Sequence, residues 1–168
     1  EKDWEKSHID SVSQLANGKN GNRIYLKNSI IAIKEYDKVV FIKQLYNSQS
    51  VIEFCEGKIQ FDNYILSIES VNSPNLKDGF YCDKRKISPT SVIRTRREGD
   101  KFTKFGGGTK SLNDYFTDKK IPASIRDSLP LIADGDQVLA IFGVAISQKI
   151  KVDECTKTIL KLAMEEEK

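Results

Sequence analysis

The sequence contains few of the residues that hold metals or form disulfide frameworks. Among its 168 residues there are three cysteines and one histidine. Cys55, Cys82 and Cys155 are odd in number, lie far apart and form no CxxC pair, so neither a disulfide framework nor a structural zinc site is expected. Three reduced thiols, as in a cytosolic protein, fit this pattern.

The sequence also lacks long apolar runs and targeting signals. No apolar run approaches the roughly 18 residues that a membrane span requires, and no secretory signal precedes the fold. We therefore expect a cytoplasmic protein with no membrane partner. The chain begins at Glu1 and its only methionine is Met164, which favours a piece cut from a longer protein.

Residue patterns typical of catalysis are missing too. The single histidine, His8, suggests no histidine-based dyad, and no group of Asp, Glu and His has the spacing of metal ligands. None of the serines lies in the pattern of a nucleophile elbow. The sequence thus predicts no catalytic residue, no metal ligand and no cofactor for this chain.

Positive charge, in contrast, is concentrated in one segment. The formal net charge is only +3, but between Lys84 and Arg126 there are 12 Lys and Arg against 4 Asp and Glu, a net charge of +8. The rest of the chain is negative overall, at −5. A localised excess of one sign favours a partner of the opposite sign, here an anion, because it raises the local potential. An ordinary solvated surface with unevenly spaced lysines is the alternative.

Apolar spacing predicts a β-rich chain with few helices. Residues 3–17 have the period of a helix that ends at Asn17-Gly18, and short β-rich runs follow from Arg23 to residue 70. The turn formers at residues 72–75 predict a linker. Further strands follow it, interrupted by two short helices at residues 111–117 and 123–129.

These elements predict a fold class and two domains. We expect a β-rich α+β fold, with an N-terminal subdomain of a short helix and strands followed by a mixed, partly barrel-like β domain with two short inserted helices. The predicted domains span residues 1–72 and 78–168.

An arginine run gives the first candidate site. If residues 92–96 form a strand, Arg94 and Arg96 share one face, and Arg97 lies at the following turn. Guanidinium groups in a row are bidentate donors suited to phosphate oxygens. Glu98 and Asp100 can pair with these arginines, so structural salt bridges are the alternative.

The glycine run Gly106-Gly107-Gly108 with Lys110, ahead of a predicted helix, gives the second candidate. Glycines let a backbone approach an anion closely, and a helix N-terminus directs its amides at that anion. The run lacks the Walker pattern, because Thr109 rather than glycine precedes Lys110. A phosphate-contacting loop on a nucleic-acid surface is the functional interpretation, and a plain glycine-rich turn or a nucleotide-using enzyme are the alternatives.

Lys119 and Lys120 lie at the junction of the two short helices, and Arg126 lies on the second of them. Tyr115 and Phe116 are nearby, and aromatic rings beside basic residues can stack on RNA bases. Their helical spacing with other apolar residues favours burial in the core instead.

Taken in order along the chain, these motifs resemble the C-terminal domain of tRNA(Ile)-lysidine synthetase. The resemblance rests on the run Ile93–Phe102, the glycine loop with Thr109-Lys110, Leu112–Phe116, Asp118–Pro122, Arg126-Asp127, Leu129–Leu131 and Phe142–Ile146. One departure is Ser111, where the family usually has a second lysine after the glycine loop.

The resemblance implies an ATP-dependent ligase that adenylates the wobble cytidine of an isoleucine tRNA and lets lysine displace AMP, giving lysidine. That chemistry, with ATP and magnesium, belongs to an N-terminal domain with a Ser-Gly-Gly-x-Asp-Ser signature, which this sequence lacks. The chain itself is therefore expected to bind the isoleucine tRNA that has the CAU anticodon and to contact this tRNA on the acceptor-stem side. It is not expected to catalyse the reaction. The resemblance also allows a homodimer of the full-length enzyme.

On this basis the expected RNA-binding residues are Arg94, Arg96, Arg97, Lys101, Gly106, Gly107, Gly108, Lys110, Lys119, Lys120 and Arg126. A nucleotide-binding enzyme that uses the loop from Gly106 to Ser111, or an interaction domain for an acidic protein, stays open as an alternative.

Overall fold

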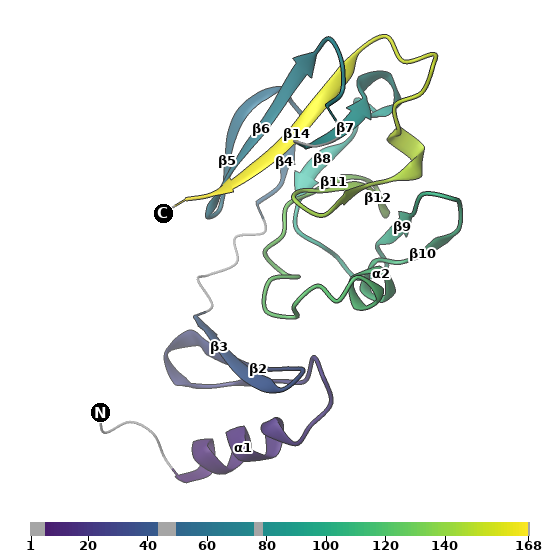
Figure 1. Cartoon of the computed structure of the whole chain (residues 1–168). Helices are drawn as coiled ribbons and strands as arrows, with labels where there is room; N and C mark the ends of the chain where they lie inside the picture. The colour runs from purple at the N-terminus through teal and green to yellow at the C-terminus, as the bar shows by residue number, and fades with distance from the viewer. Residues whose placement is uncertain (1–5, 44–49, 76–78, 168) are drawn as a thin grey trace. The chain divides into compact units, whose positions relative to one another are not determined.

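A computed structural model describes residues 6–43, 50–75 and 79–167 of the chain. The chain forms two compact units (Figure 1), a smaller one of residues 1–48 with 120–127 and a larger one of residues 49–119 with 128–168. The described residues are mostly β, with several sheets and two α-helices, so the predicted β-rich α+β class is confirmed. In the part of the chain that the structure describes, no helix is long and apolar enough to cross a membrane.

The smaller unit is a helix on a three-stranded antiparallel sheet. Its elements are α1 (Lys6–Ala16), β1 (Arg23–Tyr25), β2 (Ile30–Glu35) and β3 (Lys38–Lys43), and the strand order is β1-β2-β3. Helix α1 lies against all three strands and buries Leu15. Ile31 and Ile33 of β2 pack with Ala123, which comes from the distant segment 120–127.

Two polar contacts hold segment 120–127 in the smaller unit. The backbone N–H of Ser124 donates to the Glu35 carboxylate at 2.6 Å, and the Arg23 guanidinium donates to Asp127 at 2.8 Å. The sequence predicts a second short helix at residues 123–129, but residues 123–128 form a run of turns instead. Seven residues make a marginal helix in isolation, and here contacts with the sheet fix the segment in another conformation.

The larger unit contains a four-stranded and a seven-stranded sheet. The four-stranded sheet has the order β5-β6-β14-β7, with strands β5 (Gly57–Phe61), β6 (Tyr64–Val71), β14 (Ile159–Glu166) and β7 (Phe80–Asp83). The seven-stranded sheet has the order β10-β9-β12-β11-β8-β4, and β13 pairs with β12. Its strands are β4 (Ile52–Glu53), β8 (Val92–Arg94), β9 (Lys101–Thr103), β10 (Thr109–Ser111), β11 (Leu131–Asp134), β12 (Gln137–Ile141) and β13 (Ala145–Ile146).

The division into units differs from the predicted domains at residues 1–72 and 78–168. Strand β14, drawn in yellow in Figure 1, lies between β6 and β7, and Leu162 is in register with Ile68. Residues 57–71 therefore belong to the larger unit. Strand pairs so far apart in sequence leave no trace in local composition, which is the only signal that the prediction used.

Side chains from both sheets build one core in the larger unit. Phe61, Leu66 and Ile68 contribute from the four-stranded sheet, and Ile93 and Ile132 contribute from the seven-stranded one, each at most 1% exposed. Ile93 of this core precedes Arg94, the first candidate residue, in β8.

Helix α2 (Leu112–Asp118) follows β10 and is oriented by buried aromatic rings. The Ser111 hydroxyl caps the helix by accepting from the backbone N–H of Asp114. Tyr115 and Phe116 are buried, and the rings of Tyr115 and Phe102 lie 4.4 Å apart. The expectation that Tyr115 and Phe116 belong to the core is confirmed.

The cysteines offer a direct test of burial in the larger unit. Cys55 and Cys155 are exposed, whereas Cys82 is buried in the core, and burial raises the pKa of the Cys82 thiol to about 12. Because the thiolate is the reactive form, iodoacetamide at pH 8 should modify Cys55 and Cys155 while Cys82 reacts only in urea. Mass spectrometry of alkylated peptides measures this, with Cys55→Ser/Cys155→Ser as the control. Modification of Cys82 at the rate of the other two without urea would contradict the fold.

Candidate functional site

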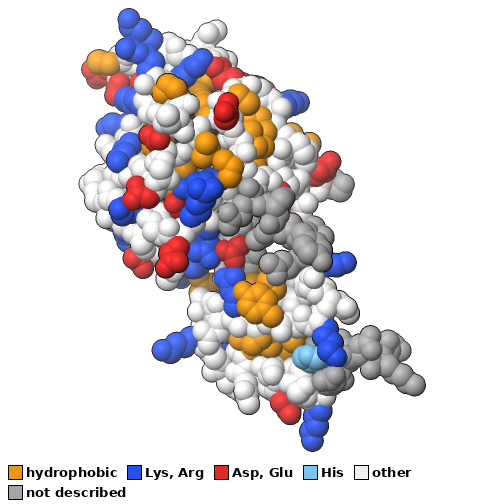
Figure 2. Space-filling view, turned by 180° about the vertical axis from the view of Figure 1, so that it is seen from behind, with side chains coloured by type: hydrophobic (Ala, Val, Ile, Leu, Met, Phe, Trp, Pro, Cys, Tyr) orange, Lys and Arg blue, Asp and Glu red, His pale blue; other side chains and the backbone are white. Residues whose placement is uncertain are grey.

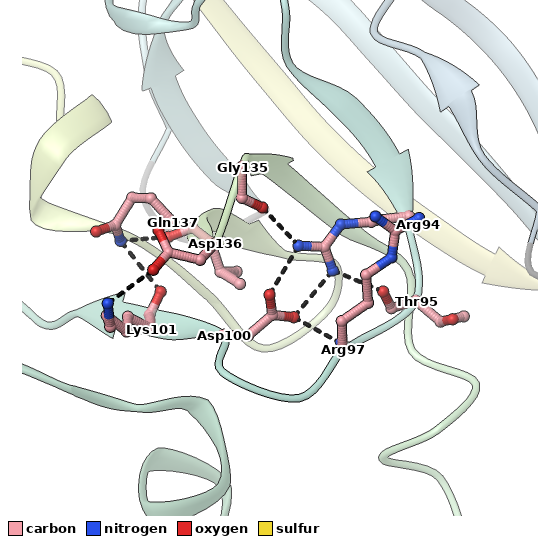
Figure 3. Close-up of polar contacts among 9 residues, drawn as sticks. Arg94, Thr95, Arg97, Asp100, Lys101, Gly135, Asp136 and Gln137 are labelled. Atoms are coloured by element: carbon pink, nitrogen blue, oxygen red, sulfur yellow. Dashed lines mark hydrogen bonds and ion pairs between the residues drawn. The ribbon is translucent and has the colours of Figure 1, made fainter.

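A buried ion pair lies at the centre of the arginine run (Figure 3). Arg94, the last residue of β8, is 2% exposed, and its guanidinium holds both carboxylate oxygens of Asp100 at 2.7 and 2.9 Å. The same guanidinium donates to the carbonyl oxygens of Thr95 and Gly135, each at 2.9 Å. Four donor contacts therefore satisfy a charge that would be costly to bury alone.

Asp100 connects this pair to the surrounding elements. Its carboxylate accepts from the backbone N–H of Arg97 at 2.8 Å, which closes the turn between β8 and β9. Its carbonyl oxygen accepts from the backbone N–H of Leu112 at 2.8 Å, where α2 begins. One residue thus fixes the end of β8, the turn and the start of α2.

The three arginines do not form the expected row. Strand β8 ends at Arg94, so the alternation that would place Arg94 and Arg96 on one face does not continue. Arg94 is buried in structural contacts, as in the salt-bridge alternative, and presents no surface to a phosphate. Arg96 is half-buried and donates to Asn113 of α2 at 2.7 Å, and Arg97 is exposed at the turn.

Two candidate lysines are paired with acids at the surface. Lys101 lies 2.7 Å from Asp136, and the hydrogen bond raises the pKa of Lys101 and lowers the pKa of Asp136. Lys110 pairs with Asp118, and this hydrogen bond lowers the pKa of Asp118. Surface pairs of this kind are weak, so a phosphate group can replace the carboxylate partner.

The glycine run forms the loop of a β-hairpin between β9 and β10. Gly106, Gly107 and Gly108 all have φ between 81° and 87°, a region that favours glycine, and Lys104 closes the loop through backbone hydrogen bonds to Gly107 and Gly108. The sequence predicts a helix directly after this run, but β10 comes first. The loop therefore lacks the strand–loop–helix arrangement of a nucleotide site, and the residues present do not fit ATP.

The remaining candidates follow α2. Lys119 is exposed at the C-terminal end of α2 in the larger unit. Lys120 is exposed, and Arg126 is half-buried with its Nε donating to the carbonyl oxygen of Ile121 at 2.9 Å. Lys120 and Arg126 belong to the smaller unit, whereas the other candidates belong to the larger one.

Within the larger unit the other candidates gather around the β9–β10 hairpin and α2. Arg96 and Lys110 contact α2, Lys119 ends it, and Arg97 lies in the turn before β9. The sequence reading missed Lys104 and Phe105, which are exposed in the hairpin loop. The sequence pattern that could have identified them is a Lys-Phe pair directly before three glycines.

Acidic and basic side chains are mixed on the surface of the molecule. On the face drawn in Figure 2, Asp and Glu side chains lie among the Lys and Arg side chains over much of the surface. Among the residues that the structure describes, no three His, Cys, Asp or Glu side chains gather in a way that could hold a metal ion.

Asp100→Asn tests the importance of the buried pair. The substitution leaves Arg94 buried without its counter-charge, so the free energy of unfolding should fall by about 3–5 kcal/mol in urea unfolding. Asp136→Asn is the matched control, since it removes one carboxylate from an exposed pair and should leave the urea midpoint nearly unchanged. Equal effects of the two substitutions would contradict the structural role of Asp100.

Comparison with known proteins identifies the region that contains this site. Residues 92–163 match the family model described as the TilS substrate C-terminal domain. The chain is 33% identical to a tRNA(Ile)-lysidine synthase of Clostridium tetani over 179 residues, and 33% identical to one of Clostridium acetobutylicum over 183 residues. These matches cover 98% and 97% of this chain, which spans 38% of the length of each relative.

A solved structure agrees with these matches. The crystal structure of a TilS C-terminal domain is similar to this chain with a TM-score of 0.59 and 27% identity, over 70% of this chain and 96% of that one. The resemblance drawn from the sequence motifs is confirmed. Since the chain matches tRNA(Ile)-lysidine synthases at 33% identity over nearly its whole length, it belongs to the tRNA(Ile)-lysidine synthase family, and residues 92–163 match that family's TilS substrate C-terminal domain.

Proposed function

We propose that this chain binds tRNA for a tRNA(Ile)-lysidine synthase. One observation carries the proposal: exposed and weakly paired basic side chains gather around the β9–β10 hairpin and α2, inside the region that matches the family's substrate domain. Cationic side chains on a rigid scaffold contact phosphates, and such contacts supply most of the affinity for a nucleic acid.

The proposal assigns a partner and a reaction to the whole protein. The partner is the isoleucine tRNA with the CAU anticodon, contacted on its acceptor-stem side, and the reaction converts the wobble cytidine to lysidine with ATP, magnesium and lysine. Because the chain spans 38% of its relatives' length and its sequence lacks the Ser-Gly-Gly-x-Asp-Ser signature, the proposal assigns the chemical step to the part of the relatives that this chain does not match. A cytoplasmic location and a homodimer of the whole protein belong to the same proposal.

The proposed contacts fall into two groups, according to whether the basic side chain must first break an ion pair within the protein. Arg97, Lys104 and Lys119 are exposed and can meet phosphates directly. Lys101 and Lys110 must first leave Asp136 and Asp118, which weakens their contribution. Duplex RNA is recognised mainly through shape, phosphates and 2′-hydroxyls, so these side chains are expected to supply affinity rather than to read bases.

A double substitution, Arg97→Gln/Lys119→Gln, tests the phosphate contacts. Each lost contact releases one fewer counterion, so the slope of log affinity against log salt should become shallower by about one unit per contact. Fluorescence anisotropy with labelled isoleucine tRNA between low and physiological salt measures the slope. Lys58→Gln/Lys157→Gln removes the same charge at exposed positions of the larger unit outside the hairpin and should leave the slope nearly unchanged. Identical slopes for both double variants would argue against the site.

Titration with ATP and magnesium addresses the nucleotide-enzyme alternative. The hairpin geometry of the glycine loop gives no anion-binding helix N-terminus, so calorimetry of the 168-residue chain should show no heat of binding at millimolar ATP. A saturable signal that Gly107→Ala abolishes would favour the alternative over tRNA binding.

A further inference from the structure

The hairpin loop exposes an aromatic side chain that the basic residues do not explain. Phe105 is 55% exposed, whereas the other phenylalanines in the described part of the larger unit that fill the core, Phe61, Phe102, Phe116 and Phe142, are at most 1% exposed. Single exposed hydrophobic residues are common in folded proteins. The exposure of Phe105 alone therefore does not indicate a binding site, and the residues around the ring must be considered.

The loop around Phe105 leaves the ring accessible. A Cβ added at Gly106 or Gly107 would meet no atom within 4 Å, so the backbone after the ring lies in open space. The hydroxyls of Thr103 and Thr109 lie 2.8 Å apart across the hairpin, and together with the backbone hydrogen bonds they hold the base of the loop. Because the glycines carry no side chains, none of them obstructs a planar group that approaches the ring.

The charged residues nearest to Phe105 in the sequence are lysines, and in space the charge of Lys104 helps to lower the pKa of Asp118 in α2. Lys104 precedes the ring, and its Cε lies 3.9 Å from the position of a Cβ on Gly108, so the lysine stem extends across the loop. Between Lys101 and Asn113 the sequence contains no Asp or Glu. An aromatic ring beside an exposed lysine combines the two elements that bind single bases of a nucleic acid, a stacking surface and a cation for the adjoining phosphate.

We propose that Phe105 stacks on an accessible base of the bound tRNA while Lys104 contacts the phosphate next to it. The proposal rests on the proposed function, since it needs an RNA on this face of the hairpin. A protein partner fits less well, because stable protein interfaces need an apolar centre of many residues and the loop offers one ring between a lysine and glycines.

Phe105→Leu separates stacking from phosphate binding. Leucine keeps an apolar side chain but removes the ring, so affinity for tRNA should fall on the order of tenfold. The salt slope should stay at the wild-type value, because no charge changes. Phe105→Tyr keeps the ring and should bind like wild type, and Phe41→Leu removes a ring of similar exposure, 50%, from the smaller unit and should have no effect.

A fluorescence experiment reports the stack directly. The only tryptophan is Trp4, so the variant Trp4→Phe/Phe105→Trp carries its one indole in the hairpin loop. Isoleucine tRNA should quench the emission, whereas heparin, a polyanion without bases, should bind the same basic residues without comparable quenching.

The outcomes distinguish the two proposals. Wild-type affinity and slope in Phe105→Leu, or equal quenching by heparin and tRNA, would overturn stacking and leave the proposed function standing. A wild-type chain that does not bind tRNA, or whose slope is insensitive to Arg97→Gln/Lys119→Gln, would overturn both. A tenfold loss in Phe105→Leu with an unchanged slope, together with quenching by tRNA alone, supports both.

Discussion

Burial of the Arg94 guanidinium imposes one requirement on the larger unit: an opposite charge must lie against it. A guanidinium that is 2% exposed no longer forms hydrogen bonds with water. Asp100 compensates by accepting two hydrogen bonds and by supplying the opposite charge. Asp100 can reach Arg94 only if the chain turns between β8 and β9. That turn, closed by the backbone N–H of Arg97 on the same carboxylate, sets where β9 begins.

The ion pair thereby determines which basic side chains reach the surface. The carbonyl oxygen of Asp100 also accepts the first backbone N–H of α2. The β9–β10 hairpin, which connects Asp100 to α2, therefore starts and ends beside the same residue. Lys104 and Phe105 then lie in the exposed loop of that hairpin, and Lys119 lies beyond the far end of α2. One short segment thus contains both a buried charge and exposed cations. Arg94 has the structural role, and Arg97 is exposed to solvent.

Local sequence signals predicted what depends on local chemistry. The burial of Tyr115 and Phe116 and the β-rich composition of the chain could be predicted, because both follow from the spacing of apolar residues. The pairing of β6 with β14 and the turns at residues 123–128 could not be predicted in this way, since both depend on partners about ninety residues away, such as Ile68 with Leu162 and Ser124 with Glu35. The sequence left the role of Arg94 open between a phosphate contact and a salt bridge, because burial is a property of the packed sheet and Arg94, Arg96 and Arg97 are the same residue type.

The pairing of Lys101 and Lys110 limits how much affinity charge alone can supply. Hydrogen bonds from these lysines lower the pKa of Asp136 and Asp118, so both carboxylates stay ionised to more acidic pH and compete there with a phosphate. Each exchange replaces one ion pair by another, and the net gain is small. A surface built in this way must gain affinity from exposed cations such as Arg97 and from contacts that do not depend on charge. An exposed ring between Lys104 and a run of glycines provides such a contact, because stacking on a base does not require one ion pair to be exchanged for another.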